Sequence, residues 1–158
     1  MRANRAKTCI DRVCNEWSTI TPVARDDIAP FVVAAFDIEF KSSTGKVPDA
    51  DVPKDACFQM AIALCTFGSE EPYDKTCFCY KKTDPNLEGS NIISFDTEKE
   101  MLLAFKEYVN KQEIDIMTGW KIFGLDLEYI YKRADMVGCG REFYEWGELE
   151  DGEGSDGW

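Results

Sequence analysis

The chain has 158 residues, of which 18 are Lys or Arg and 30 are Asp or Glu, giving a net charge of −12. Hydrophobic residues make up 44% and aromatic residues 13%, which is typical of a folded chain and excludes a largely disordered one. The length allows at most one domain with a substantial core, and no apolar run is long enough to span a membrane. The basic residues at the start precede no apolar segment, so we expect no signal peptide and no secretion.

The negative charge is concentrated at the C-terminal end of the chain. Seven acids and no base lie between residues 142 and 158, and without this stretch the net charge is −5. A strongly acidic protein is a poor partner for a polyanion. Because much of the excess charge belongs to a short tail, it is only a weak argument against nucleic-acid binding.

The sequence contains no histidine, which excludes general acid–base catalysis by histidine and Ser-His or Cys-His nucleophile pairs. Any hydrolysis must therefore use carboxylates and metal ions. The seven cysteines are an odd set without a Cys-x-x-Cys motif, which argues against a disulfide framework and a paired-knuckle zinc site. Cys77 and Cys79 would share one face of a strand and supply two ligands at most. Free thiols that fill a core in a reducing compartment are the favoured interpretation.

The predicted elements follow the order β-β-β-α-β-α after a lead-in over residues 1–30. Apolar runs predict strands at 31–40, 57–67 and 75–82, and residues 91–95 are short and extended. Thr97 and Glu100 form a capping box that begins a helix ending near Lys111. Residues 114–120 predict a fourth strand, and a second helix runs from about residue 126 to 137. Three leading strands and a strand between two helices predict a mixed α/β sheet.

Two carboxylates lie near the end of the first predicted strand. Asp37 and Glu39 are two positions apart, so their side chains point to the same face of the strand. A divalent cation would neutralise such a pair, because carboxylate oxygens suit Mg²⁺ and Mn²⁺. The alternative is a strand end that simply reaches solvent, and the residues alone support both interpretations about equally.

Asp126 lies between the fourth predicted strand and the second helix. It can act as the N-cap of that helix, a position that Asp favours. It can also bring a third carboxylate to the edge of the sheet where Asp37 and Glu39 lie. Two-metal hydrolases need several acids from different elements at one such edge.

These segments resemble the exonuclease domain of family B DNA polymerases. The Phe-Asp-Ile-Glu run at 36–39 is similar to the first exonuclease motif, and residues 115–126 are similar to the second. Segments 55–61 and 94–105 also match, in the same order, within a likeness that runs from about Cys14 to Val137. The likeness is closest to eukaryotic delta-type catalytic subunits and their relatives in large DNA viruses. It implies a ribonuclease-H-like fold and 3′→5′ proofreading with two Mg²⁺ (or Mn²⁺) ions.

The resemblance also implies roles for individual residues. Asp37 and Glu39 would hold the metal ion that activates water, and Asp126 would join the second ion. Lys121 and Phe123, in the second motif, would contact nucleic acid. Lys121 stands where the family usually has Asn, so it would contact phosphate or would pair with Asp37 or Glu39 and displace a metal ion.

The resemblance also covers Gln59 on the second predicted strand, and Trp120 and Leu125 in the second motif. Gln59 would support the site structurally. Trp120 stands at the family's aromatic position, and Leu125 replaces the Phe that usually precedes the aspartate.

The third motif of the family, Tyr-x-x-x-Asp, is missing from its expected place. Tyr131 and Asp135 match its letters, but Asp135 follows Asp126 by nine residues in one predicted helix, which at about 100° per residue places the two acids on opposite faces. The sequence therefore predicts a partial exonuclease domain over residues 31–138, incomplete at its C-terminus. An acidic tail or truncated continuation follows over 139–158. We expect this fragment alone to be inactive.

The expected partners follow from the same resemblance. They are the single-stranded 3′ end of a DNA primer, the rest of the polymerase chain and replicase accessory subunits, with no membrane. The expected location is intracellular, in the nucleus of a eukaryote or in the host cell of a virus. One alternative is a catalytically silent domain of the same fold that binds nucleic acid or docks within a replicase. Another is an acidic interaction protein that imitates the charge of DNA.

Overall fold

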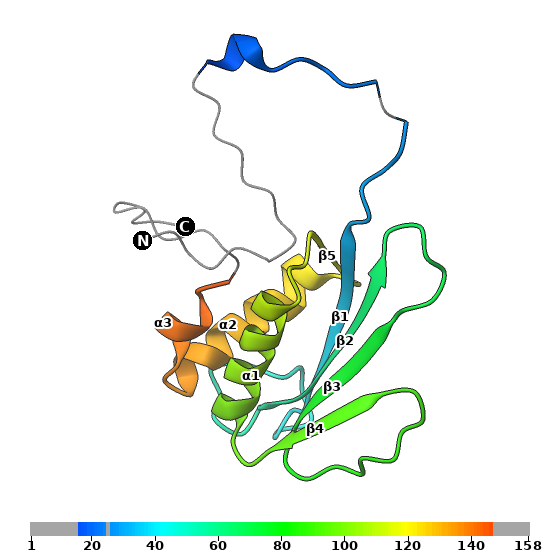
Figure 1. The fold of residues 1–158 in the computed structure, drawn as a ribbon. Helices are drawn as coiled ribbons and strands as arrows, with labels where there is room; N and C mark the ends of the chain where they lie inside the picture. Colours follow the sequence, from blue (N-terminus) through cyan, green and yellow to red (C-terminus); the bar gives the residue numbers. More distant parts are fainter. Residues whose placement is uncertain (1–15, 25, 147–158) are drawn as a thin grey trace.

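A five-stranded mixed sheet forms the centre of the computed structural model, which describes residues 16–24 and 26–146 (Figure 1). The sheet order is β4-β3-β2-β1-β5. The strands are β1 (Val32–Phe40), β2 (Cys57–Thr66), β3 (Asp74–Tyr80), β4 (Asn91–Phe95) and β5 (Ile116–Thr118). The β1–β2 and β2–β3 pairs are antiparallel, whereas β3–β4 and β1–β5 are parallel. The predicted mixed α/β sheet is confirmed.

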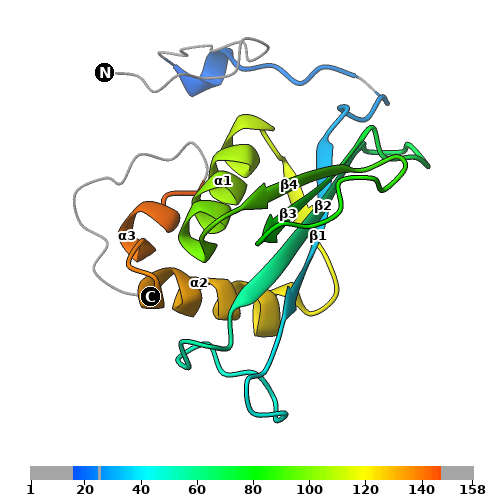
Figure 2. The ribbon, with the colours of Figure 1, turned by 90° about the horizontal axis from the view of Figure 1, so that it is seen from below.

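The helices gather on one face of this sheet, as Figures 1 and 2 show. They are α1 (Glu98–Lys111), the π-helix η2 (Ile122–Asp126), α2 (Leu127–Met136) and the short α3 (Gly140–Phe143). A 3₁₀ turn, η1 (Trp17–Thr19), lies outside the packed region on the exposed N-terminal segment. Among the described residues, no helix is both long and apolar enough to cross a membrane.

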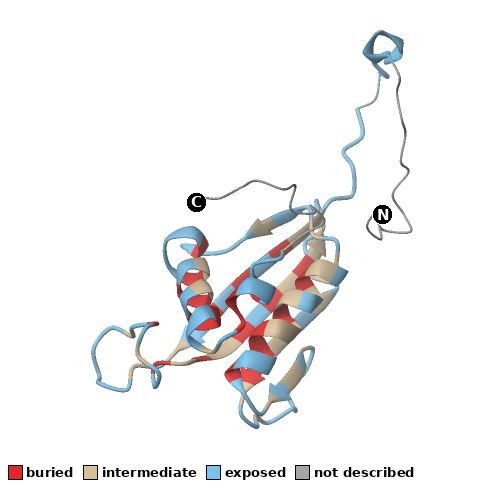
Figure 3. Cartoon of the chain, turned by 90° about the vertical axis from the view of Figure 1, so that its left-hand side faces the viewer, coloured by how far each residue is buried: buried red, intermediate tan, exposed pale blue. Residues whose placement is uncertain are grey.

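Alternation along β1 decides what faces the helices and what faces solvent. Ala34, Phe36 and Ile38 are buried, whereas Asp37 and Glu39, which alternate with them, are exposed. The buried face packs against α1, where the Phe36 and Phe105 rings lie 5.9 Å apart between centroids. Figure 3 shows the buried residues concentrated between the helices and the sheet. The two acids therefore lie on the face of the sheet that the helices leave open.

A buried ion pair joins the helices to the loop that follows β1. Arg133 of α2 donates through Nε to Glu98 Oε1 of α1 at 2.8 Å, and its guanidinium also donates to the Ala50 and Val52 carbonyls at 3.0 and 2.9 Å. Glu98 Oε1 accepts a further bond from the Cys57 amide at 2.9 Å. These contacts hold the loop between β1 and β2 in one position.

Three segments differ from the sequence prediction. The strand expected over 114–120 shortens to Ile116–Thr118, because the chain turns sharply at Gly119 to enter the π-helix η2. Residues 91–95 form a full edge strand. A third helix, α3, follows residue 138, and its Phe143 is fully buried, so packed structure continues beyond the expected domain end. The acidic tail from residue 147 lies outside the described residues.

Candidate active site

Asp37 and Glu39 lie side by side along β1, on its exposed face. Their register partners on β2 are Ala61 and Gln59, and the register shifts between Glu39 and Phe40. The shared face that the alternation predicts is therefore confirmed. The open sheet face next to Asp37 also forms a cavity of about 680 Å³, to which Asp37 and Cys77 contribute.

Asp126 occupies the last position of the π-helix η2 and is only 2% exposed. Its side chain makes no capping hydrogen bond to α2, and its backbone is helical (φ −66°, ψ −51°), so it does not act as the N-cap that sequence alone allowed. Its Oδ2 atom has no hydrogen-bond partner. Burial, and then the charge of Asp37, raise the pKa of this carboxyl above its usual value. The charge of Asp37 therefore acts on a buried carboxyl, that of Asp126, whose Oδ2 has no hydrogen-bond partner.

The turn between β5 and α2 explains why Asp126 reaches this position. A Cβ atom at Gly119 would clash with the Phe36 carbonyl oxygen and with the Ile122 side chain, so only glycine lets the chain pass this close to β1. Lys121 then takes a left-handed conformation (φ 57°), and the chain enters the π-helix. Single π-turns are rare and occur often at functional sites. The turn directs the Asp126 side chain inward, where the charge of Asp37 raises its pKa.

Glu39 lies beside Asp37 on β1, and the charge of Asp37 acts on Asp126. Among the described residues, no group of three or more Asp, Glu, Cys or His side chains converges on one metal position. Asp37 and Asp126 nevertheless suit a divalent cation, because the buried Oδ2 lacks any other partner and a cation would offset the repulsion between the two carboxylates. The part of Glu39 in such a site remains a prediction.

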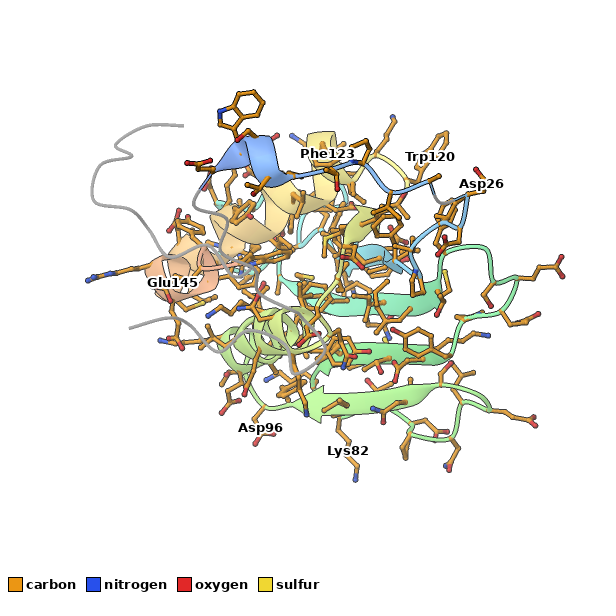
Figure 4. All side chains as sticks on the ribbon, turned by 45° about the horizontal axis from the view of Figure 1, so that its top comes forward. Asp26, Lys82, Asp96, Trp120, Phe123 and Glu145 are labelled. Carbon is orange, nitrogen blue, oxygen red and sulfur yellow. The ribbon has the colours of Figure 1, made fainter. Side chains whose placement is uncertain are left out.

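Apolar and basic side chains surround the entry to η2. Trp120 is 83% exposed and Phe123 is 81% exposed, and Leu125 is also exposed. Figure 4 places Trp120 and Phe123 at the same edge of the molecule, opposite the edge that carries Lys82 and Asp96. Lys121 lies between the two aromatic residues, is exposed, and forms no ion pair with Asp37 or Glu39, which are both among the described residues. These four residues, Trp120, Lys121, Phe123 and Leu125, are called the η2 patch below.

Tyr131 and Asp135 lie away from the acids of β1. The Tyr131 ring packs edge-on against Phe143 and Tyr144 of the C-terminal region. Asp135 is exposed near the other end of α2, where a Cβ atom at Gly140 would strike its carboxylate. This placement agrees with the expectation that the pair does not form part of the acid cluster.

Comparison with known proteins identifies the family of this chain. The model of the DNA polymerase family B exonuclease domain matches residues 2–155. The chain belongs to this family. The exonuclease domain is 34% identical over 118 residues to a DNA polymerase of Acanthamoeba polyphaga mimivirus, which covers 74% of this chain and 7% of that protein. The five-stranded mixed sheet with its helices is consistent with the ribonuclease-H-like fold of the family.

Two further relatives come from an animal and a herpesvirus. The domain is 36% identical over 110 residues to the DNA polymerase delta catalytic subunit of Caenorhabditis elegans, covering 70% of this chain and 10% of that protein. It is 32% identical over 113 residues to the DNA polymerase catalytic subunit of human herpesvirus 8, covering 72% and 11%. The chain thus spans about a tenth of the length of these relatives.

Sequence reasoning missed two features of the site. The π-helix has no simple periodic signature, although Gly119 before it and Gly124 within it indicate an irregular turn. The η2 patch was anticipated only at Lys121 and Phe123, whereas the structure adds Trp120 and Leu125 as exposed apolar neighbours. For Leu125 the available signal was its departure from the Phe of the family pattern, and for Trp120 it was the match to the family's aromatic position.

Proposed function

We propose that this exonuclease domain is the 3′→5′ proofreading part of a family B DNA polymerase and hydrolyses the 3′ end of single-stranded primer DNA. The observation that carries the proposal is the buried Asp126 side chain, whose Oδ2 has no hydrogen-bond partner and whose pKa is raised by burial and then by the charge of Asp37. Because the chain contains no histidine, carboxylates are the groups left to support hydrolysis. The nucleus of a eukaryote or a virus-infected host cell is the proposed setting.

The acids would act by holding Mg²⁺ or Mn²⁺. Asp37 and Asp126 would supply the first ligands, and Glu39 would join from the next outward position of β1. Two such ions, when bound, supply an activated water and stabilise the leaving oxygen. The protein contributes a carboxylate fixed by burial on η2 and two carboxylates fixed by the pairing of β1 with β2.

The η2 patch would receive the DNA end. Trp120 and Phe123 present exposed rings on which unpaired bases can stack, an interaction worth about 1–3 kcal/mol per base. Lys121 offers a cation for a phosphate group between those rings. This local basic and aromatic surface would offset the unfavourable net charge of the whole chain.

Metal binding tests the acid cluster directly. We expect isothermal titration with Mn²⁺ to show binding that is lost in Asp37→Ala and is weakened at least about tenfold in Asp126→Asn. Asp135→Asn is the matched control, because it removes an exposed acid of α2 and should leave binding unchanged. Equal Mn²⁺ affinity in all three variants would exclude the proposed metal site.

DNA binding tests the η2 patch. We expect Phe123→Ala to weaken binding of a fluorescent single-stranded oligonucleotide by at least fivefold, measured by anisotropy at fixed salt, because one stacking interaction is lost. Lys121→Ala should weaken binding less and reduce its salt dependence. Phe67→Ala changes an exposed phenylalanine outside the patch and should have no effect. An unchanged affinity of Phe123→Ala for the oligonucleotide would contradict DNA binding by the η2 patch.

A second candidate is a catalytically silent domain that binds nucleic acid or docks within a replicase. It is favoured by the absence of a converging three-acid group among the described residues. DNA binding that persists without Mn²⁺ binding would support it over the first candidate. In either case the remainder of a polymerase chain and accessory subunits are proposed partners. We also propose that the 158-residue chain alone is inactive, because the aspartate of the family's third motif has no candidate at its expected place.

A further inference from the structure

The open face of the sheet carries a close pair of cysteine thiols. Cys77 and Cys79 both lie on β3, two positions apart, and their Sγ atoms are 3.6 Å from each other. Their β2 neighbours are Ala61 and Gln59, and Gln59 Nε2 lies 3.8 Å from Cys79 Sγ. Cys79 is buried, whereas Cys77 is partly exposed and lines the cavity beside Asp37.

The spacing of the two thiols disfavours a disulfide bond. Residues i and i+2 of a strand have Cα atoms about 6.6–6.8 Å apart, at the upper limit of the range that disulfides span. The S–S bond would also require the sulfurs to approach to about 2.05 Å. The observed arrangement is instead a hydrogen-bonded pair of free thiols, in which one S–H donates to the other sulfur.

The same spacing fits two ligands of one tetrahedral metal ion. With Zn–S bonds of about 2.3 Å at a tetrahedral angle, the two sulfurs stand about 3.8 Å apart. The observed 3.6 Å therefore needs almost no rearrangement. The side-chain amide of Gln59 lies next to the pair, and the cavity gives solvent water access from the Cys77 side. Turning the Gln59 amide over, so that its oxygen replaces the Nε2 that now faces Cys79, would supply a third ligand, and water would supply the fourth.

We propose that Cys77 and Cys79 form a two-thiolate site for a thiophilic divalent ion such as Zn²⁺ or Cd²⁺, separate from the carboxylates. Binding breaks two S–H bonds, forms two sulfur–metal bonds and releases two protons to solvent, so affinity rises with pH. Soft thiolates select such ions, whereas Asp37 and Asp126 suit hard Mg²⁺ or Mn²⁺. Asp37 and Cys77 are both register partners of Ala61, about 9–10 Å apart across β2.

Cadmium titration of the reduced 158-residue chain tests the site. Cys9 and Cys14 lie outside the described residues, so both are first changed to Ser in every sample. We expect one Cd²⁺ per chain and an ultraviolet thiolate-to-cadmium charge-transfer band. The band should be lost, or the affinity should fall at least about tenfold, in Cys77→Ser. Circular dichroism would check that the Cys77→Ser chain is folded, which we expect because Cys77 is only partly buried.

Two control variants distinguish the site from its alternatives. Cys65→Ser removes a partly exposed thiol of β2 and should leave the band intact. Asp37→Asn should also leave it intact, so the result is independent of the proposed exonuclease site. The proposal is overturned by the absence of a band, by an unchanged band in Cys77→Ser, or by loss of the band in Asp37→Asn.

Discussion

Buried charge in this domain has two different settings, the ion pair between α1 and α2 and the carboxylate at the end of η2. Glu98 and Arg133 are 6% and 1% exposed, and each has several hydrogen-bond partners. Asp126 is equally buried, but its Oδ2 has no partner. Because an unpaired buried charge is unfavourable, a protein retains one only where something else uses it. The difference separates acids whose hydrogen bonds and ion pairs hold the fold together from an acid with a buried oxygen that has no partner.

The pKa directions of two carboxyls show the same contrast. The pKa of Asp55 is lowered first by a hydrogen bond from the Ser43 side chain, and then by hydrogen bonds from the Ser43 amide at 2.6 Å and the Asp49 amide at 3.0 Å. Asp126 lacks such donors, and burial followed by the charge of Asp37 raises its pKa. Both side chains are almost fully buried, so burial alone does not decide the direction. The hydrogen bonds that each carboxyl accepts decide whether its pKa is lowered or raised.

Breaking the ion pair should give the largest effect on stability. Arg133→Met leaves Glu98 buried without its cation, and we expect the free energy of unfolding to fall by about 3–5 kcal/mol in urea titration. Lys132→Ala removes the neighbouring exposed pair with Glu128 and should change stability by less than about 0.5 kcal/mol. Adding Glu98→Gln to Arg133→Met should restore part of the loss. Equal effects of the Arg133 and Lys132 variants would contradict the structural role of the buried pair.

Widening the turn that brings Asp126 to β1 should give the next largest effect. Gly119→Ala forces a methyl group against the Phe36 carbonyl, and we expect a loss of about 1–3 kcal/mol together with weaker Mn²⁺ binding. Gly124→Ala is the matched control, because a Cβ atom there meets nothing within 4 Å and its φ is not positive. A Gly119 variant as stable as the Gly124 variant would show that the close approach is not required.

Neutralising the unpartnered acid should raise stability modestly in metal-free solution. The folded-state pKa of Asp126 lies above 3.8, so the folded protein binds more protons than the unfolded chain, and stability falls as pH rises from below 3.8 through the raised pKa. Asp126→Asn should remove this fall and add on the order of 1 kcal/mol at neutral pH. Urea titrations from pH 3 to 7 measure both. A native protein whose stability rises over this window as steeply as that of the variant would refute the assignment.

Removing the exposed N-cap of α1 should give the smallest effect on stability. The Thr97 side chain caps α1 by accepting from the Glu100 amide at 3.2 Å, and Glu100 accepts from the Thr97 amide at 3.0 Å. Thr97→Ala should lower the free energy of unfolding by about 0.5–1 kcal/mol, measured as a shift of the urea midpoint at constant slope. Thr44→Ala, in an exposed loop, is the control. A loss as large as that of Arg133→Met would erase the contrast between exposed and buried partners.

Local patterns predicted much of the architecture. The alternation of Phe36, Asp37 and Ile38 defined the faces of β1, and the Thr97 and Glu100 pair predicted the start of α1. Both signals arise from interactions between residues close in sequence, so they survive without knowledge of the fold. A strand was predicted over residues 114–120, but its short length was not. The length of β5 depends on the close approach of Gly119 to Phe36, a residue far away in the chain.

The sequence alone excluded histidine-based chemistry, since histidine is absent, and determined that Asp37 and Glu39 would share one face of a strand. Only the tertiary structure decided the state of Asp126. An aspartate before a helix usually caps it, but here the π-turn places its side chain inward, near Asp37 and without a partner. The reason is physical: alternation along a strand is a local property of the backbone, whereas burial and loss of hydrogen-bond partners depend on which distant segments meet.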